Sequence, residues 1–292
     1  MVVFKPDRVK KCCKVKVSVI VLNYNSSSDS RKCIGFLKKQ KGVEQEIVVV
    51  DNCSREDDRE VVERICKEQG CTFIANHENR GYSAGNNIGL RYAADKGYEY
   101  ALIANPDMEF PQDYYLKKLV EIMIDDPTIA VCASDIVNTN GVHQNPMREM
   151  TYWEEFLWPL TAFKNRKNDM WFIEDYTKSS YCEKISGCCF MIRISFLQKI
   201  DFLDEGTFLY SEEPILAKQV YNEGMRTYYY AEAQALHRHI KSEKGNAKIR
   251  MQLLFQSRDY YLSKYSGYSP LQLFLLKLSK KIQSLLSDII IK

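Results

Sequence analysis

Three short signatures that often reveal a function are missing from this 292-residue sequence. It has no G-x-x-x-x-G-K-[ST] motif, which excludes a P-loop, and its first apolar run leads into LNYNSSS rather than into G-x-G-x-x-G. The second absence argues against a dinucleotide-dependent oxidoreductase. No C-x-x-C occurs among the ten cysteines either, so a structural zinc site has little support. We expect reduced, mostly buried thiols in a cytosolic protein.

A strong excess of charge and a long apolar run are absent as well. The 41 Lys and Arg residues against 38 Asp and Glu residues give a net charge of +3, which is too small to indicate a nucleic-acid partner. The apolar run Val17 to Leu22 is too short for the hydrophobic region of a signal peptide and fits a strand better. With 45% hydrophobic and 27% charged residues, the composition is typical of a soluble globular protein.

The segment GYSAG, Gly81 to Gly85, raises the question of a serine hydrolase, because its G-x-S-x-G pattern is that of a nucleophile elbow. In an elbow, a strand runs directly into the serine. Here polar residues 76–80 precede the segment, and the nearest strand candidate ends at Ala75. We therefore predict a glycine-rich loop in which Ser83 is not a nucleophile.

Strand and helix patterns alternate along the first half of the chain. Continuous apolar runs predict two buried strands, in KVSVIVLNYN and EIVVVDNCS, and two further strands are expected in CTFIA and YEYALIANPDMEF. The segments between them predict helices, among them 56–69 and 84–96. This alternation is typical of an α/β fold with a doubly wound, mostly parallel sheet. Beyond residue 130 it weakens, and 152–181 is irregular, although IAVCASDIV, ISGCCFMIRISFLQKI and YYYAEAQALH still contain strand patterns.

Polar side chains follow the ends of three predicted strands, where ligands of such sheets bind. These groups are Asn23-Tyr24-Asn25, Asp51-Asn52 and Asn105-Pro106-Asp107. Asp51 could accept hydrogen bonds from a nucleoside, or it could form a strand-end turn or helix cap. Because proline disfavours helix in the residue before it, Asn105 is expected to be extended. Asp107 could then hold Mg²⁺ or Mn²⁺ against a diphosphate, or belong to a simple turn.

Acids and histidines in the second half are further candidates. Glu212 and Glu213, in FLYSEEPIL, could open a helix and complement its dipole, or one of them could act as a general base. In ALHRH, His237 and His239 lie on one face if the segment is extended. They are either surface histidines or additional metal ligands.

The order of these pieces closely resembles glycosyltransferase family 2. The matching pieces are strands ending in N-Y-N, D-N and N-P-D, the loop NRGYSAGNN, and the segments SGCCFMIR, DEGTFLYSEE and LHRH. The likeness covers roughly residues 15–245 and is strongest to the rhamnosyltransferase-like branch, which builds bacterial surface polysaccharide. It implies a GT-A fold, a nucleotide-sugar donor, a divalent cation (Mg²⁺ or Mn²⁺) and an inverting displacement at the anomeric carbon.

The resemblance also implies roles for individual residues. Asn23, Tyr24 and Asp51 would contact the nucleoside, and the sugar nucleotide would lie beside Asn52, Gly81, Gly85, Asn86 and Asn105. Asp107 would hold the metal, with His237 as a further ligand. Glu213 takes the place of the catalytic base, with Glu212 as the second choice. The family usually has Glu-Asp followed by a small or apolar residue, so Glu213 and the following Pro214 are departures.

The resemblance divides the chain into a GT-A domain, 1–250, and a helical tail, 251–292. Within the domain, about 15–130 would form the nucleotide-sugar half and 131–250 the acceptor half. The acceptor would be a glycan, such as a lipid-linked saccharide in surface polysaccharide synthesis. Two rival functions are a nucleotidyltransferase, for which NYNSSSDS lacks the usual glycine- and basic-rich signature, and a catalytically degenerate scaffold of a polysaccharide assembly complex.

The tail contains one apolar stripe at helical spacing. Its members recur at i, i+3, i+4 and i+7: Leu271, Phe274, Leu275, Leu278, Ile282, Leu285, Leu286 and Ile289. Lysines and other polar residues interrupt the run, so it is too polar to span a bilayer. It is either a helix packed on the domain or a helix lying on the membrane surface. The second alternative predicts a cytoplasmic protein held at the inner face of the cytoplasmic membrane.

Overall fold

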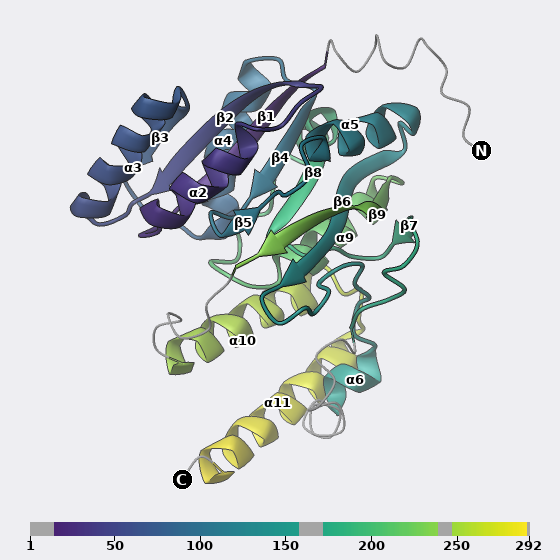
Figure 1. Ribbon diagram of the computed structural model, residues 1–292. Coiled ribbons are helices and arrows are strands. Elements are labelled where there is room, and N and C mark those ends of the chain that lie inside the picture. Colours follow the sequence, from purple (N-terminus) through teal and green to yellow (C-terminus); the bar gives the residue numbers. More distant parts are fainter. Residues whose placement is uncertain (1–14, 158–171, 239–246, 291–292) are drawn as a thin grey trace.

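A computed structural model of the chain describes residues 15–157, 172–238 and 247–290, with side chains placed from 248 to 281 in the last range. His239 lies outside the described residues, as do the side chains of the apolar stripe beyond position 281. The described part is an α/β structure with helices on both faces of one sheet (Figure 1).

Four parallel strands form the first half of the sheet. They are β1 (Lys16–Asn23), β2 (Glu44–Asn52), β3 (Thr72–Asn76) and β4 (Tyr100–Ala104), in the order β3-β2-β1-β4. Alternate residues of β1 enter two clusters: Val19 and Val21 lie with helices α2 (Ser27–Leu37) and α3 (Glu56–Gln69), and Ile20 lies with α4 (Tyr82–Asp95). Burial on both faces explains why β1, β2 and β4 read as unbroken apolar runs, whereas β3, at the edge of the sheet, is only partly buried. The predicted helix 56–69 coincides with α3, and α4 begins two residues before the predicted position.

The second half of the sheet is mixed. β8 (Cys189–Arg193) runs antiparallel to both β4 and β6 (Ile129–Asn138), and β9 (Arg226–His237) runs parallel to β6. The short strands β5 (Met108–Glu109) and β7 (Ser180–Cys182) pair with β9 in the antiparallel sense. The three strands expected after residue 130 are therefore present, and among the described residues all strands belong to one sheet.

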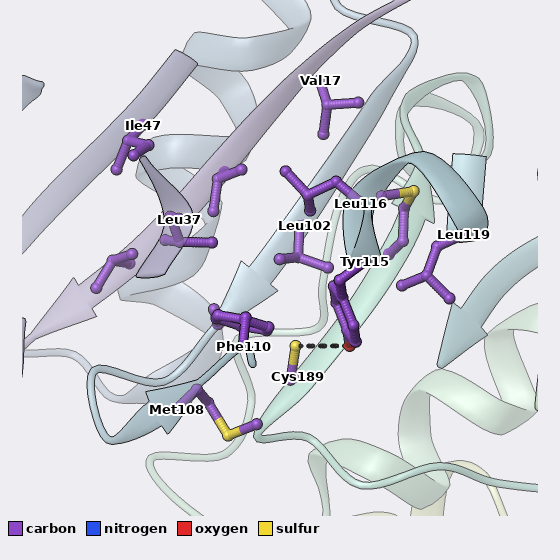
Figure 2. Close-up of a cluster of buried hydrophobic side chains, with 14 of the residues drawn as sticks. Val17, Leu37, Ile47, Leu102, Met108, Phe110, Tyr115, Leu116, Leu119 and Cys189 are labelled. Atoms are coloured by element: carbon purple, nitrogen blue, oxygen red, sulfur yellow. Dashed lines mark hydrogen bonds between the residues drawn. The ribbon is translucent and has the colours of Figure 1, made fainter. Parts of the chain in front are cut away.

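The two halves share one core on the face covered by α5 (Tyr115–Asp125). Tyr115 is fully buried, and its hydroxyl lies 2.9 Å from Ser134 Oγ and 3.5 Å from Cys189 Sγ. Figure 2 shows this ring beneath Leu116 and Leu119, between the helix and the sheet. The opposite face carries α8 (Ile194–Lys199) and α9 (Glu212–Asn222). One aromatic side chain thus joins α5, β6 and β8.

Two helices, α10 (Ala247–Lys264) and α11 (Pro270–Ile290), follow the sheet. Leu276 of α11 is 1% exposed in a small cluster with Ile215, Tyr261 and Leu262, and α6 (Tyr152–Phe156) packs against the same cluster. The described members of the predicted stripe instead lie partly or largely in solvent, at 68% for Leu271, 62% for Phe274 and 47% for Leu278. The helix therefore packs through one face and leaves a second apolar face uncovered by the described residues. Within the described ranges, no helix is long and apolar enough to cross a membrane.

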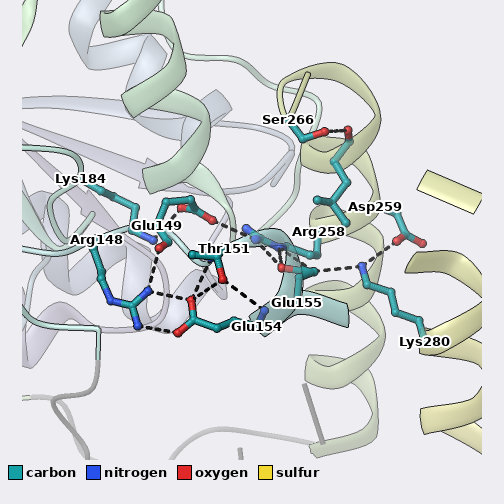
Figure 3. A network of polar contacts seen from close by, with 11 residues as sticks. Arg148, Glu149, Thr151, Glu154, Glu155, Lys184, Arg258, Asp259, Ser266 and Lys280 are labelled. Atoms are coloured by element: carbon teal, nitrogen blue, oxygen red, sulfur yellow. Dashed lines mark hydrogen bonds and ion pairs between the residues drawn. The ribbon is translucent and has the colours of Figure 1, made fainter. Parts of the chain in front are cut away.

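A buried ionic network fixes both helices to the domain (Figure 3). Glu155 of α6 accepts hydrogen bonds from Arg258 of α10, with Nε–Oε2 at 2.9 Å, and lies 3.6 Å from Lys280 of α11. Arg258 also reaches Glu149 at 2.9 Å. Burial raises the pKa of Glu149, but the nearby Lys184 and Arg258 charges outweigh burial, so the net shift is downward. The Glu149 carboxylate is thus held ionised by its partners.

Candidate active site

Asn23, at the end of β1, is the centre of a buried hydrogen-bond network. Its Nδ2 lies 2.9 Å from Asp51 Oδ1 and 2.9 Å from Asp58 Oδ2, and its Oδ1 accepts from the Ser30 hydroxyl at 2.8 Å. Asp51 also accepts from the backbone N–H of Ser54 at 3.2 Å, which is the strand-end turn considered above. Asn23 and Asp51 are both fully buried. The network fixes the end of β1 against β2, and contact with a nucleoside stays a prediction for both residues.

The next residue, Tyr24, is 53% exposed at the same rim. An exposed aromatic ring beside a fixed strand end is suited to stacking on a nucleobase. Tyr24 therefore has the exposed surface that its predicted contact with the nucleoside requires.

The glycine-rich loop is held by Asn52. The Asn52 amide nitrogen donates to Asn79 Oδ1 at 3.1 Å and to the Gly81 carbonyl at 3.3 Å. Gly81 has φ +103, and a Cβ there would lie 2.2 Å from the Phe208 carbonyl oxygen. A Cβ on Gly85 would lie 2.7 Å from Leu22 Cδ1. Both glycines therefore permit close approach of protein segments, and their predicted contact with the sugar nucleotide stays untested.

Ser83 lies in the first turn of α4 and is 3% exposed. β3 ends at Asn76, and residues 77–81 form the predicted loop. The loop prediction is wrong for Tyr82 to Gly85, because α4 already begins at Tyr82. Asn86, fully buried one turn later, donates from Nδ2 to the Tyr82 carbonyl at 3.0 Å, and its Oδ1 has no hydrogen-bond partner among the described residues. A buried amide oxygen of this kind is available to a ligand donor.

The structure brings Asp107 and His237 together. Asp107 follows β4 and precedes β5, which pairs with the end of β9, so that Met108 lies opposite His237. His237 Nε2 is 3.3 Å from Asp107 Oδ2, and His237 Nδ1 is 2.8 Å from Gln144 Oε1. The backbone N–H of Met108 donates to the Asn105 carbonyl at 3.2 Å. The N-P-D segment therefore also forms a turn, which was the alternative interpretation of this motif.

The chemistry of this pair suits a divalent cation. Burial lowers the pKa of His237, but hydrogen bonds to Asp107 and Cys188 raise it, with a net value of about 10, so this imidazole is protonated beside Asp107 and must release a proton to ligate a cation. Within the described residues, no group of three or more His, Cys, Asp or Glu side chains could hold a metal ion. One carboxylate and one imidazole would therefore need phosphate oxygens and water to complete the coordination, which is common for Mg²⁺ and Mn²⁺. The residues present fit a cation that binds together with a diphosphate.

Glu212 and Glu213 open α9, as the helix-start interpretation predicts. Glu213 Oε1 accepts from the backbone N–H of Gly187 at 3.3 Å. Burial, and then the Glu213 charge, raise the pKa of Glu212 to about 8, and its Oε1 has no hydrogen-bond partner among the described residues. Pro214 occupies the first turn of α9, where a missing N–H leaves no helical hydrogen bond unmade. The departure at Pro214 is therefore compatible with the helix.

Two neighbouring residues connect the acidic pair to the Asp107–His237 pair. Gly187 donates to Glu213, and the Cys188 carbonyl accepts from the Asn105 N–H at 2.8 Å. Both glutamates also line a narrow pocket with Tyr82, whose hydroxyl donates to the Gly187 carbonyl. Gln144, Gly187 and Tyr82 were not identified from the sequence. SGCCFMIR was identified as a strand pattern and as part of the family resemblance, without a role for Gly187, and no motif marks a backbone N–H as a carboxylate partner.

Comparison with known proteins gives a consistent result. Residues 18–200 match the profile described as Glycosyl transferase family 2. The low-salt glycan biosynthesis hexosyltransferase Agl10 of Haloferax volcanii is 29% identical over 210 residues, which are 69% of this chain and 62% of that protein. The uncharacterized glycosyltransferase YibD of Escherichia coli (strain K12) is 26% identical over 120 residues, 41% of this chain and 34% of its own length. The chain thus spans less than two thirds of these relatives.

Two solved structures share the fold at low identity. The mannosyltransferase PcManGT from Pyrobaculum calidifontis, in complex with GDP-Man and Mn²⁺, has a TM-score of 0.59 and 17% identity, over 94% of this chain and 74% of that chain. GalNAc-T7 with UDP, GalNAc and Mn²⁺ has a TM-score of 0.60 and 16% identity, over 91% of this chain and 54% of that chain. Both likenesses concern the fold.

Proposed function

The chain belongs to glycosyl transferase family 2, and on that premise we propose that it transfers a hexosyl group from a nucleotide-diphosphate sugar to a glycan hydroxyl. One observation carries the proposal: Gly187 and Cys188 connect the carboxylate of Glu213 to the segment that carries Asp107. Glu213, as a base for the acceptor, and Asp107, as a cation ligand for the leaving diphosphate, would then both lie next to the segment Gly187-Cys188. The hexosyltransferase relative supports the sugar class, and its role in low-salt glycan biosynthesis supports a glycan acceptor.

Glu213 acts in this proposal as the general base. Its carboxylate takes the proton of the acceptor hydroxyl while that oxygen attacks the anomeric carbon, and the bond from this carbon to the diphosphate oxygen breaks on the opposite face. The configuration at the anomeric carbon is therefore inverted, and no covalent sugar–enzyme intermediate is required. Glu212, with a pKa near 8, is the second candidate for the base.

Asp107 and His237 would hold Mg²⁺ or Mn²⁺ against the diphosphate. The cation, when bound, would supply Lewis-acid stabilisation of the negative charge that develops on the leaving diphosphate. The two solved structures of this fold that contain Mn²⁺ support this role. Asn23, Tyr24, Asp51 and Asn52 would position the nucleoside. Gly81 and the first two turns of α4, which contain Gly85 and Asn86, would lie beside the sugar nucleotide, with Asn105 next to the diphosphate.

The donor is best identified by binding before turnover. A thermal-shift screen of nucleoside diphosphates and their sugars, with Mn²⁺, Mg²⁺ or chelator, should show cation-dependent stabilisation by one base type. That donor should then release its nucleoside diphosphate slowly in the absence of acceptor, and chelator should abolish the release. Binding without any release would favour the scaffold alternative. Pyrophosphate formation from a nucleoside triphosphate and a sugar phosphate would favour a nucleotidyltransferase.

We further propose that α11 brings the site to a lipid-linked saccharide at the inner face of the cytoplasmic membrane. The exposed side chains of Leu271, Phe274 and Leu278 lie at i, i+3 and i+7, so they share one helix face. Lys277 and Lys281 are exposed on the same helix and could reach anionic headgroups. A rhamnosyltransferase-like activity in surface polysaccharide synthesis would be consistent with such an acceptor.

Substitution of the exposed face tests this without removing the packed face. Leu271→Gln, Phe274→Gln and Leu278→Gln together should leave the melting temperature close to that of the parent and abolish sedimentation with anionic liposomes. A matched variant with Lys277→Gln and Lys281→Gln should weaken sedimentation and reduce its salt sensitivity. If the triple variant sediments as the parent does, α11 does not bind the membrane through this face.

A further inference from the structure

The segment 201–211, which leads into the acidic pair, is attached to α10. The carboxylate of Asp204, whose side chain is 7% exposed, accepts hydrogen bonds from the Tyr260 hydroxyl at 2.8 Å and from Lys264 Nζ at 2.7 Å. The Tyr265 hydroxyl and the Gly206 N–H donate to the same carboxylate. Four donors, three of them from the end of α10 and the residue after it, therefore converge on one buried side chain.

Two further contacts join the same surfaces. A Cβ on Gly206 would lie 2.0 Å from Tyr260 Cζ, so the segment passes directly against the tyrosine ring. The Ser257 hydroxyl donates to the Leu209 carbonyl at 2.7 Å. On the other side, the Tyr82 N–H donates to the Phe208 carbonyl at 2.9 Å. The segment is thus fixed between α4 and α10.

The backbone conformation of the two residues that end this segment is unfavourable by itself. Tyr210 and Ser211 have φ values of +75 and +65, which are left-handed conformations that non-glycine residues rarely adopt. Such conformations persist only where the surroundings impose them. Glu212 and Glu213 follow directly, and Asp204 lines the same pocket as both glutamates.

We propose that Asp204 is a positioning residue, which acts through Glu213 by fixing segment 201–211 to α10. This inference rests on the proposed role of Glu213 and adds that α10 completes the active site. Asp204 is a weaker base than an ordinary carboxylate, because its pKa is lowered: burial raises the pKa, but hydrogen bonds from Lys264 and Tyr265 outweigh burial. Its oxygens are already occupied by protein donors.

A double-mutant cycle tests the proposal in the full-length protein. Asp204→Asn should lower kcat by about 10–100-fold and leave the affinity for the nucleoside diphosphate within about two-fold, because only the base is displaced. In a Glu213→Gln background the same substitution should change kcat by less than about two-fold, because the base it positions is already absent. Asp201→Asn is the matched control, since Asp201 lies in the same segment with its side chain 92% exposed.

Amide hydrogen exchange gives a readout that does not depend on turnover. Residues 205–213 should exchange faster in Asp204→Asn than in Asp201→Asn. An equal kcat loss in both backgrounds, or unchanged exchange, would overturn the positioning role. If Asp204→Asn does not fold, Tyr265→Phe removes one donor and should produce the same pattern with a smaller loss. A parent that binds donor but never transfers sugar would refute the proposed function alone, and exchange would then decide whether Asp204 fixes the segment.

Discussion

The end of β1 and the start of α9 differ in whether their buried polar side chains have hydrogen-bond partners within the protein. At Asn23 both amide atoms are engaged within the protein, and Asp51 is paired through both of its oxygens. At Glu212 an oxygen is buried without a hydrogen-bond partner among the described residues, and the pKa is raised to about 8. A satisfied network makes a rigid surface, whereas an unsatisfied carboxyl beside another acid is prepared for proton transfer. The comparison suggests that the two regions divide binding from chemistry.

Loss of Asp107 is expected to have the largest effect, because it would remove a ligand of the proposed cation. Asp107→Ala should reduce turnover by at least about 10³-fold and make nucleoside-diphosphate binding insensitive to Mn²⁺. Asp113→Ala, which changes an exposed acid in the next loop, should leave both unchanged. Titration calorimetry with and without Mn²⁺ measures the binding. Binding by Asp107→Ala that still increases with Mn²⁺, as in the parent, would reduce Asp107 to a turn residue.

Removal of the base should affect the rate and spare binding. Glu213→Gln is expected to lower kcat by roughly 10²–10⁴-fold, the usual contribution of a general base, with donor affinity unchanged. Glu212→Gln is the adjacent comparison, measured in the same transfer assay. A damaging Glu212→Gln beside a harmless Glu213→Gln would exchange the two roles. If neither substitution matters, the base lies elsewhere.

At the end of β1, in contrast, we expect substitution to reduce stability more than it reduces the rate of transfer. Asn23→Ala leaves the buried Asp51 and Ser30 without their partner, which should lower the free energy of unfolding by roughly 2–4 kcal/mol. Urea denaturation measures this change, and Asn140→Ala at an exposed turn should have little effect. A stable Asn23→Ala variant that no longer binds nucleoside would place Asn23 in direct ligand contact instead.

Glu212 should make the stability of the protein depend on pH. Burial raises the pKa of Glu212 from 4.5 to about 8, so the folded protein binds this proton more tightly than the unfolded chain does. The resulting stabilisation is present below pH 4.5 and is lost as the pH rises towards 8. Glu212→Gln should therefore raise the melting temperature at pH 9 by about 5 °C relative to the parent and change it little at pH 4.5. If Glu212→Gln and the parent have the same melting temperature at pH 9 as well as at pH 4.5, Glu212 is solvated like an ordinary carboxyl.

Most of the region formed by β1 to β4 could be predicted from the sequence. The strands β1, β2 and β4 follow from unbroken apolar runs, and polar groups at their ends follow from the rule that parallel strands end on one rim. The contact between Asp107 and His237 depends on the pairing of β5 with β9, and a two-residue strand has no periodicity to detect. Periodicity likewise identified an apolar stripe in α11, but it could not show that Leu276, outside the stripe, faces the domain. Those facts depend on packing between segments far apart in the chain.

The attachment of Asp204 to α10 has a consequence for the order in which the protein matures. The four parallel strands are complete by residue 104, and their pairing needs no later part of the chain. The partners of Asp204 lie 56 to 61 positions further along the sequence. During synthesis the donor region could therefore fold while the partners of the acidic segment are still within the ribosome. Competence for transfer would therefore arrive last, after the strands that carry the proposed nucleoside-binding residues have folded.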